Sequence, residues 1–460
     1  MSRGAIVALL VVVLIGGLAV AVWTAVARER DYEDLLARGD AALAADQTDV
    51  AVEAYSGALA LKDTSMVAYL RRGEAYRRRG DLGNAIRDLR AASRLDPSAE
   101  RPLELLGDVN YSLERYPKAV ESYQQFVALD ERNPRVQYKL GLAMFRAGDT
   151  AGALPVLQKA VSLNDRLAEA HYLLGLCLKP QGRRAEAVKA LEKAVALAPT
   201  MVAPREVLAE MLESAGRSRE AIGQFESVAA LEPDRPDRQT AVAEAYARSG
   251  KTDVAVGILG RAAERYPDNA VVYLALGRIW LDTAEPRRDR MALRKAIEAL
   301  EPLTRGPRTS GEALTLYGRA LILSGDLPGG AAALAQSADR LPVNPGTLLL
   351  LADVSERLGR TAVVRSALER WVALTQESGS TRSAVLERLG DVCLRLNDEP
   401  GAIRAWHKAT EVNPAPAVFL RLAAAELHAN RLADARATMA QALERNPRNQ
   451  ALLDYQRRIQ

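Results

Sequence analysis

The segment at residues 245–252 carries the residue types of a phosphate-binding loop, because Gly250, Lys251 and Thr252 follow one another at its end. In such a loop the backbone N–H groups and the lysine contact phosphate. This geometry requires a strand before the loop and a helix that starts at its end. The residues before Gly250 follow a helical pattern instead, so we predict that the chain binds no nucleotide.

Other residue types that catalyse reactions or bind metals are few and scattered. His171, His407 and His428 have no second histidine and no carboxylate at metal-ligand spacing. We interpret Cys177 and Cys393, the two cysteines, as buried unpaired thiols. No Ser/His/Asp set and no pair of carboxylates stands out. We therefore predict a protein that is not an enzyme, with no catalytic residue, no metal and no cofactor.

The composition narrows the protein class further. In 460 residues, 62 Lys and Arg oppose 58 Asp and Glu, and this small surplus gives no reason to expect a nucleic-acid partner. Two cysteines exclude a disulfide scaffold. Aromatic residues make up 5% of the chain, while alanine, leucine and arginine dominate, which favours helices.

Residues 5–27 form an apolar run in which only Thr24 has a polar side chain. A helix of that length would reach about 34 Å, enough for a hydrocarbon layer of about 30 Å. We predict a short tail at 1–4, a membrane-spanning signal anchor at 5–27 and a linker at 28–31. A cleaved signal peptide is the alternative, since Ala25 and Ala27 fit an A-x-A cleavage site.

Orientation follows from the flanking arginines. Arg3 precedes the apolar run, while Arg28, Arg30 and Arg38 follow it, and this asymmetry favours a cytoplasmic body. The predicted location is therefore the inner membrane, with a single crossing. A periplasmic body stays open, because long domains cross membranes regardless of charge.

The remainder of the chain repeats with a period of 34 residues. A small residue recurs at this spacing: Gly39, Gly73, Gly107, Gly141, Gly175, Ala209, Ala243 and Gly277. Seven residues after such markers stand residues that tolerate positive φ: Gly80, Gly148, Gly182, Gly216, Gly250, Gly325, Gly359, Asn397 and Asn430. Each unit is thus predicted to be two helices that cross closely at the small residue, joined by a tight turn.

This pattern resembles the tetratricopeptide repeat, a helix–turn–helix unit of 34 residues. The resemblance covers 32–449 as about twelve units, with insertions near 283–291 and 376–382 and a capping helix at 450–460. The units begin at Tyr32, Met66, Glu100, Pro134, Ala168, Val202, Pro236, Ala270, Gly311, Pro345, Ser383 and Pro416. The resemblance implies an all-α, right-handed superhelical solenoid, here preceded by the membrane helix.

Members of this family usually bind proteins or peptides in a concave groove, at places 2, 5, 9 and 12 of each unit. The apolar residues at these places are Tyr111, Tyr138, Leu142, Phe145, Tyr172 and Leu176, and the acidic residues include Glu206, Glu210, Glu213 and Glu244. A segment with apolar anchors and basic residues would suit such a surface. The alternative is that the aromatic residues pack between helices and the carboxylates are solvated.

The resemblance extends to bacterial membrane-anchored tetratricopeptide proteins that support envelope assembly, although the chain lacks the C-x-x-C pairs of the lipopolysaccharide assembly adaptors. We therefore predict a membrane-anchored scaffold that gathers protein partners for a cell-envelope complex. One alternative is an exported envelope or polysaccharide-secretion component whose groove holds a glycan or nascent chain. An enzyme is the third hypothesis.

Overall fold

The computed structural model describes the backbone of residues 3–287, 289–306, 309–376 and 379–459, and of residues 3–13 and Arg287 it describes no side chain. Every regular element in these residues is helical, so the all-α part of the predicted fold class is confirmed. The chain divides into two compact units, Met1–Gln224 and Phe225–Gln460, and the division falls within α12 (Ser218–Leu231).

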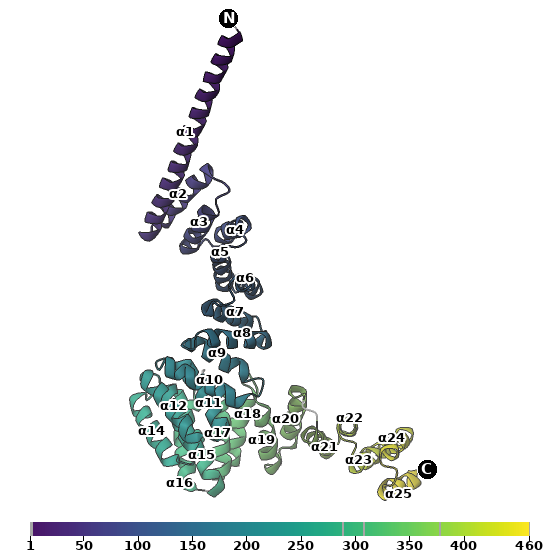
Figure 1. Ribbon diagram of the computed structural model, residues 1–460. Coiled ribbons are helices and arrows are strands. Elements are labelled where there is room, and N and C mark those ends of the chain that lie inside the picture. Colours follow the sequence, from purple (N-terminus) through teal and green to yellow (C-terminus); the bar gives the residue numbers. More distant parts are fainter. Residues whose placement is uncertain (1–2, 288, 307–308, 377–378, 460) are drawn as a thin grey trace. The chain divides into compact units, whose positions relative to one another are not determined.

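The first unit contains five complete helix pairs, each made of a first and a second helix, followed by the first helix of the next pair. Figure 1 shows these pairs following one another along the chain, from α1 at the N-terminus. The helices are α1 (Arg3–Ala44), α2 (Thr48–Leu61), α3 (Met66–Arg79), α4 (Leu82–Leu95), α5 (Glu100–Ser112), α6 (Tyr116–Leu129), α7 (Pro134–Arg146), α8 (Thr150–Leu163), α9 (Ala168–Leu178), α10 (Arg184–Leu197) and α11 (Val202–Ser214).

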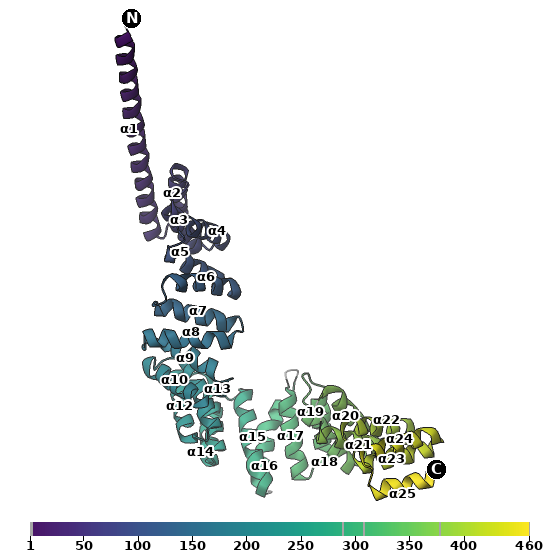
Figure 2. The same ribbon diagram turned by 45° about the vertical axis from the view of Figure 1, so that its right-hand side comes forward.

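The second unit continues the same alternation and ends on a single helix, α25, which packs on the last pair. Its helix pairs can be followed in Figure 2 from α13 to α24. The helices are α13 (Pro236–Arg248), α14 (Thr252–Arg265), α15 (Ala270–Arg287), α16 (Arg290–Leu300), α17 (Gly311–Ser324), α18 (Leu327–Ala338), α19 (Pro345–Arg357), α20 (Thr361–Leu374), α21 (Ser380–Arg395), α22 (Glu399–Val412), α23 (Pro416–His428), α24 (Leu432–Arg445) and α25 (Gln450–Ile459).

The turns inside the repeats have the predicted left-handed residue. Gly80 ends α3 at φ 84°, and the other predicted glycines and both asparagines also have positive φ. Two further repeats place a residue with a side chain in this conformation, Asp46 at φ 58° and Glu114 at φ 56°. All of these residues stand at place 15 of their repeat, so the same backbone geometry is imposed on four residue types.

The small markers lie where the two helices of a repeat cross. A methyl group at Gly107 would overlap the ring of Tyr123, and one at Gly390 would overlap the indole of Trp406. Each pair joins place 8 of the first helix to place 24 of the second. The predicted reason for the small residue, close approach of the two helices, is therefore confirmed.

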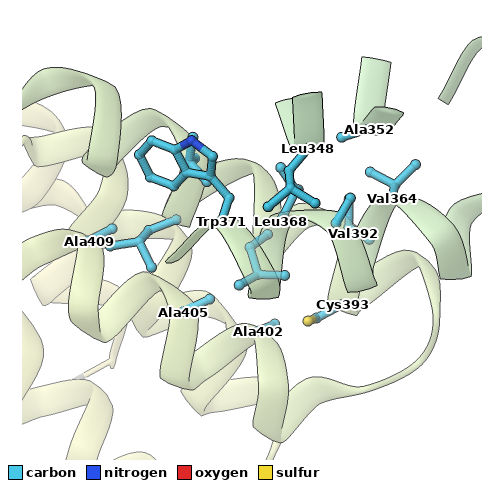
Figure 3. Close-up of a cluster of buried hydrophobic side chains, with 14 of the residues drawn as sticks. Leu348, Ala352, Val364, Leu368, Trp371, Val392, Cys393, Ala402, Ala405 and Ala409 are labelled. Carbon is cyan, nitrogen blue, oxygen red and sulfur yellow. The ribbon is translucent and has the colours of Figure 1, made fainter. Parts of the chain in front are cut away.

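The core of the second unit shows how successive repeats share buried side chains. Trp371 and Leu368 of α20 lie in one buried cluster with Leu348 of α19, and Val392 of α21 belongs to the same cluster (Figure 3). Each repeat therefore stabilises its neighbour, as expected for a chain of short units that cannot bury a core alone.

The predicted insertions fall at the ends of helices. Helix α15 has 18 residues, whereas α13 has 13, and a short 3₁₀ helix (Glu301–Thr304) follows α16. Helix α21 begins at Ser380, within the segment predicted as the second insertion. Residue 288 of the first insertion and residues 377–378 of the second lie outside the described residues.

The predicted membrane-spanning helix is wrong. In the part of the chain that the structure describes, no helix combines the length and the apolar character needed to cross a membrane. Residues 5–13 of the predicted span lie outside the described side chains.

Helix α1 then continues without a break into the charged residues Arg28, Glu29, Arg30 and Asp31. The apolar run is thus the beginning of a 42-residue helix whose end packs on α2 as the first repeat. The inner-membrane location and the membrane partner predicted from residues 5–27 depended on the span and are wrong with it.

Candidate functional site

The predicted apolar residues of the groove lie on the first helices of three consecutive repeats in the first unit. Tyr111 belongs to α5, Tyr138, Leu142 and Phe145 belong to α7, and Tyr172 and Leu176 belong to α9. Helices α7 and α9 contact each other directly. We call these six residues the aromatic shelf. All six are half-buried, so each presents part of its side chain to solvent.

The hydroxyl groups of the shelf distinguish it from the core tyrosines. Tyr55 and Tyr123, which lie in the core, donate hydrogen bonds of 2.7 Å to Asp40 and Asp108. The hydroxyls of Tyr111, Tyr138 and Tyr172 make no hydrogen bond with any described residue. The three shelf hydroxyls are therefore available as donors or acceptors for a bound molecule.

Burial keeps the hydroxyls of Tyr138 and Tyr172 protonated. Burial raises the pKa of Tyr138 and of Tyr172 above their ordinary value, and nearby carboxylates (Glu169 for Tyr138, Glu206 for Tyr172) act in the same direction. The charge of Arg146 opposes both shifts, which places this guanidinium near both hydroxyls. At neutral pH Tyr138 and Tyr172 consequently offer neutral phenols next to a cation.

The structure divides the predicted acidic residues between the two units. Glu206, Glu210 and Glu213 stand on α11, in the first unit, and Glu210 accepts a hydrogen bond of 3.0 Å from Lys179. Glu244 belongs to α13, in the second unit, where it pairs with Arg278 at 2.9 Å. The four carboxylates therefore do not all belong to one unit.

Sequence reasoning missed a series of ion pairs that joins successive first helices. Arg278 contacts both Glu244 and Glu312, so α13, α15 and α17 are linked in turn. Arg319 reaches Glu285 at 2.9 Å, and Arg388 reaches Glu356 at 2.6 Å. In the first unit Lys139 contacts Glu104 at 2.7 Å and Asp108 at 2.8 Å.

A spacing in the sequence could have revealed one of these pairs. Glu244 and Arg278 are 34 residues apart, which is the length of one repeat, and both stand at place 9 of their repeats, where opposite charges can meet. The insertion near 283–291 puts Glu312 at place 2 of its repeat, so its pair with Arg278 does not follow from the repeat length. The first-helix face of the second unit is thus largely engaged in its own ion pairs, in contrast to the aromatic shelf.

The other residues that were considered for nucleotide binding, catalysis or metal binding lie in surroundings that explain them without such a role. Gly250, at φ 82°, joins α13 to α14, so a helix and not a strand precedes the loop that resembles a phosphate site. His171 is buried and lies 3.2 Å from Asp165. Among the residues that the structure describes, no group of three or more histidine, cysteine or acidic side chains converges to hold a metal.

Comparison with known proteins gives partial matches. The chain is 37% identical over 111 residues to small glutamine-rich tetratricopeptide repeat-containing protein 2 of Mycosarcoma maydis, which covers 24% of this chain and 31% of that protein. The protein of the same name from Saccharomyces cerevisiae is 27% identical over 101 residues, 22% of this chain and 29% of that protein. The chain thus spans about a third of the length of these relatives.

A solved structure, that of MamA, is also similar. It is 30% identical in the aligned part, which covers 35% of this chain and 95% of that one, with a TM-score of 0.34.

Models of protein families match the repeats of this chain. A tetratricopeptide-repeat model matches residues 36–100, 138–202, 172–239 and 387–450. A second, described as TPR repeat, matches 107–148, and a third, another tetratricopeptide-repeat model, matches 236–279. These segments make up more than half of the chain and follow the helix pairs of both units. The chain belongs to the tetratricopeptide repeat family.

Proposed function

We propose that this chain is a protein-interaction scaffold that binds a segment of a partner protein on the aromatic shelf. The observation that supports this most directly is the state of the three shelf hydroxyls. They are half-exposed and have no partner among the described residues, while many charged residues on neighbouring first helices are paired within the chain. A peptide can bind to a surface that combines exposed apolar side chains with hydroxyl groups that make no hydrogen bond within the chain.

The composition of the shelf favours a peptide over a sugar. Leu142, Phe145 and Leu176 supply apolar surface with no polar atom, and this suits aliphatic or aromatic anchors of a partner. That the partners belong to a cell-envelope complex stays a prediction.

A pull-down with the full chain tests this proposal. The Tyr138→Ala, Tyr172→Ala double variant removes two hydroxyls and two rings from the shelf. The control is Tyr266→Ala, which removes a half-buried tyrosine from the end of α14 in the second unit. Partners that the wild type and the control retain and the double variant loses would support the shelf. Retention of every partner by the double variant would exclude it.

A further inference from the structure

Place 11 of the first helix is occupied by a large apolar or aromatic residue in most repeats, as in Tyr76, Met144, Leu178, Leu212, Tyr246, Trp280 and Leu321. Five repeats have a smaller or polar residue there instead, namely Ala42, Asn110, Ser355, Cys393 and Glu426. Asn110, Ser355 and Glu426 each have a buried side-chain atom with no hydrogen bond among the described residues. Place 11 is therefore packed imperfectly in a subset of repeats.

Two surface pockets lie at this place, in different repeats. One, of about 350 Å³, lies between the second helices α20 and α22 and includes Cys393. The other, of about 270 Å³, lies between the second helices α4 and α6 and includes Asn110. Ala405 in the first pocket and Ser122 in the second both stand at place 23 of their repeats. The two pockets are thus the same feature of the repeat.

The residue at place 11 explains why these pockets exist. In the repeats with leucine, tyrosine or tryptophan at this place, the side chain extends from the first helix toward the second helices. Cysteine and asparagine are shorter, so the space between two successive second helices is left unfilled. Figure 3 shows Cys393 in the buried cluster with Ala402 and Ala405 of α22, whose small side chains widen the same gap.

The pocket at Cys393 is lined by apolar side chains and by three basic ones, Arg382, Arg404 and Lys408. One carboxylate, that of Glu369, also belongs to the lining and is paired with Arg365. Val372, Leu386 and Leu389 contribute to its apolar lining. Burial raises the pKa of the Cys393 thiol, which is therefore protonated and uncharged at neutral pH. Among the lining residues, Arg404 and Lys408 stand one turn apart on α22. They are exposed and make no ion pair or hydrogen bond with any described residue.

Arg382, also at this pocket, is held in place by a hydrogen bond of 2.6 Å to the carbonyl oxygen of Thr375. A volume of about 350 Å³ is at the lower end of the range for small-ligand sites, roughly 300–1,000 Å³. It has room for one side chain and not for a long segment.

We propose that the pocket at Cys393 binds a single apolar side chain of an acidic partner segment, whose carboxylates pair with Arg404 and Lys408. The apolar side chain contacts Val372 and Leu389, and the flanking carboxylates stay at the rim, where the two cations have no other partner. This site lies between second helices and uses none of the shelf residues. It is therefore independent of the function proposed for the first-helix face.

Binding of a short fluorescein-labelled peptide, with one leucine flanked by glutamates, to the full chain tests this site by anisotropy. Cys393→Leu puts at place 11 the residue that Leu178 and Leu212 already provide, so the repeat retains its packing while the pocket is filled. Arg404→Glu with Lys408→Glu changes only exposed residues. We expect each variant to weaken binding by about tenfold or more, which is about 1.4 kcal/mol of affinity. Cys393→Leu fills the space of the apolar anchor, and the Arg404/Lys408 variant removes the two cations that pair with the carboxylates of the peptide.

The matched control is Lys189→Glu. Lys189 is exposed and stands at place 22, like Arg404, in a repeat whose place 11 is Leu178. Its reversal should leave the affinity unchanged, as should replacement of the shelf tyrosines Tyr138 and Tyr172. Laurate, a free fatty acid, is tested as a second probe. The proposal is overturned if the wild type does not bind the peptide, whether or not it binds laurate. It is also overturned if the shelf variant abolishes binding while Cys393→Leu and the Arg404/Lys408 variant do not.

Discussion

Arg72 and Asp88 form a two-pronged ion pair between the helices of the second repeat, with 2.6 Å from Nε to Oδ2 and 3.1 Å from Nη2 to Oδ1. The Asp88 side chain is 2% exposed, and the guanidinium also donates to Ser56 and lies over the rings of Tyr69 and Tyr76. The half-buried Arg72 thus connects α2, α3 and α4.

Removing the cation should destabilise the first unit strongly. Arg72→Met leaves Asp88 buried without its partner, so we expect a loss of about 3 kcal/mol in the free energy of unfolding. Urea denaturation followed by circular dichroism measures it. Arg79→Met is the control, since the pair of Arg79 with Asp49 is exposed and should contribute little to the free energy of unfolding. Equal losses in the two variants would contradict this interpretation of the buried pair.

The close crossing of the two helices in a repeat predicts how a glycine-to-alanine substitution changes the stability of the protein. Gly107→Ala places a methyl group against the ring of Tyr123, which is buried and anchored by its hydrogen bond to Asp108. Because the ring cannot retreat without losing that bond, we expect a loss of about 1–3 kcal/mol. Gly260→Ala, in the interior of α14 with open space around it, should instead stabilise by about 0.5–1 kcal/mol. Melting temperatures of the two variants should therefore move in opposite directions.

Glu426 makes the stability of the last complete repeat depend on pH. It is 3% exposed, its Oε2 has no partner among the described residues, and burial raises its pKa above 4.5. Between pH 4.5 and the folded-state pKa, the folded chain therefore binds a proton that the unfolded chain has lost. The stability that this group contributes is complete below pH 4.5 and is lost as the pH rises through the folded-state pKa.

Glu426→Leu should accordingly stabilise the protein at neutral pH, by about 1–3 kcal/mol, because it removes a buried unpaired acceptor. Leucine is the residue at the same place in α9, α11 and α17. The advantage over the wild type should shrink as the pH falls toward 4.5. Glu444→Leu, which replaces an exposed glutamate of α24, should show no such pH dependence. Urea midpoints across this pH range distinguish the two, and a constant advantage would exclude the titration of Glu426 as the cause.

The repeat architecture was predictable because its constraints are local and recur. Gly107 and Gly390 are small for the same steric reason, and the turn residues must adopt positive φ in every repeat. The membrane prediction failed because it depended on residues 5–27 alone. The continuation of the same helix into the first repeat could not be seen from the apolar pattern.

The candidate surfaces were predictable only in part. The places of Tyr138 and Tyr172 follow from the register, and the structure shows both half-buried. That Glu244 belongs to another unit than the other three acids depends on where the chain divides, which no local pattern indicates. The pocket at Cys393 was missed because it results from a residue that is too small at place 11, an absence that a search for chemical groups does not detect.

The turn of the third repeat allows the energetic cost of its left-handed backbone conformation to be measured. Glu114 adopts φ 56°, a conformation that costs a residue with a Cβ about 1–2 kcal/mol and glycine almost nothing. The N–H of Glu114 donates to Tyr111 and that of Arg115 to Asn110, both at 2.9 Å, and neither bond involves the Glu114 side chain. Glu114→Gly should therefore stabilise the repeat by about 1 kcal/mol. Gly148→Ala makes the reverse change at the equivalent turn of the next repeat, where the same two bonds form, and should destabilise by a similar amount. Thermal melts of both variants measure the effects, and a Glu114→Gly chain no more stable than the wild type would show that the turn carries no such strain.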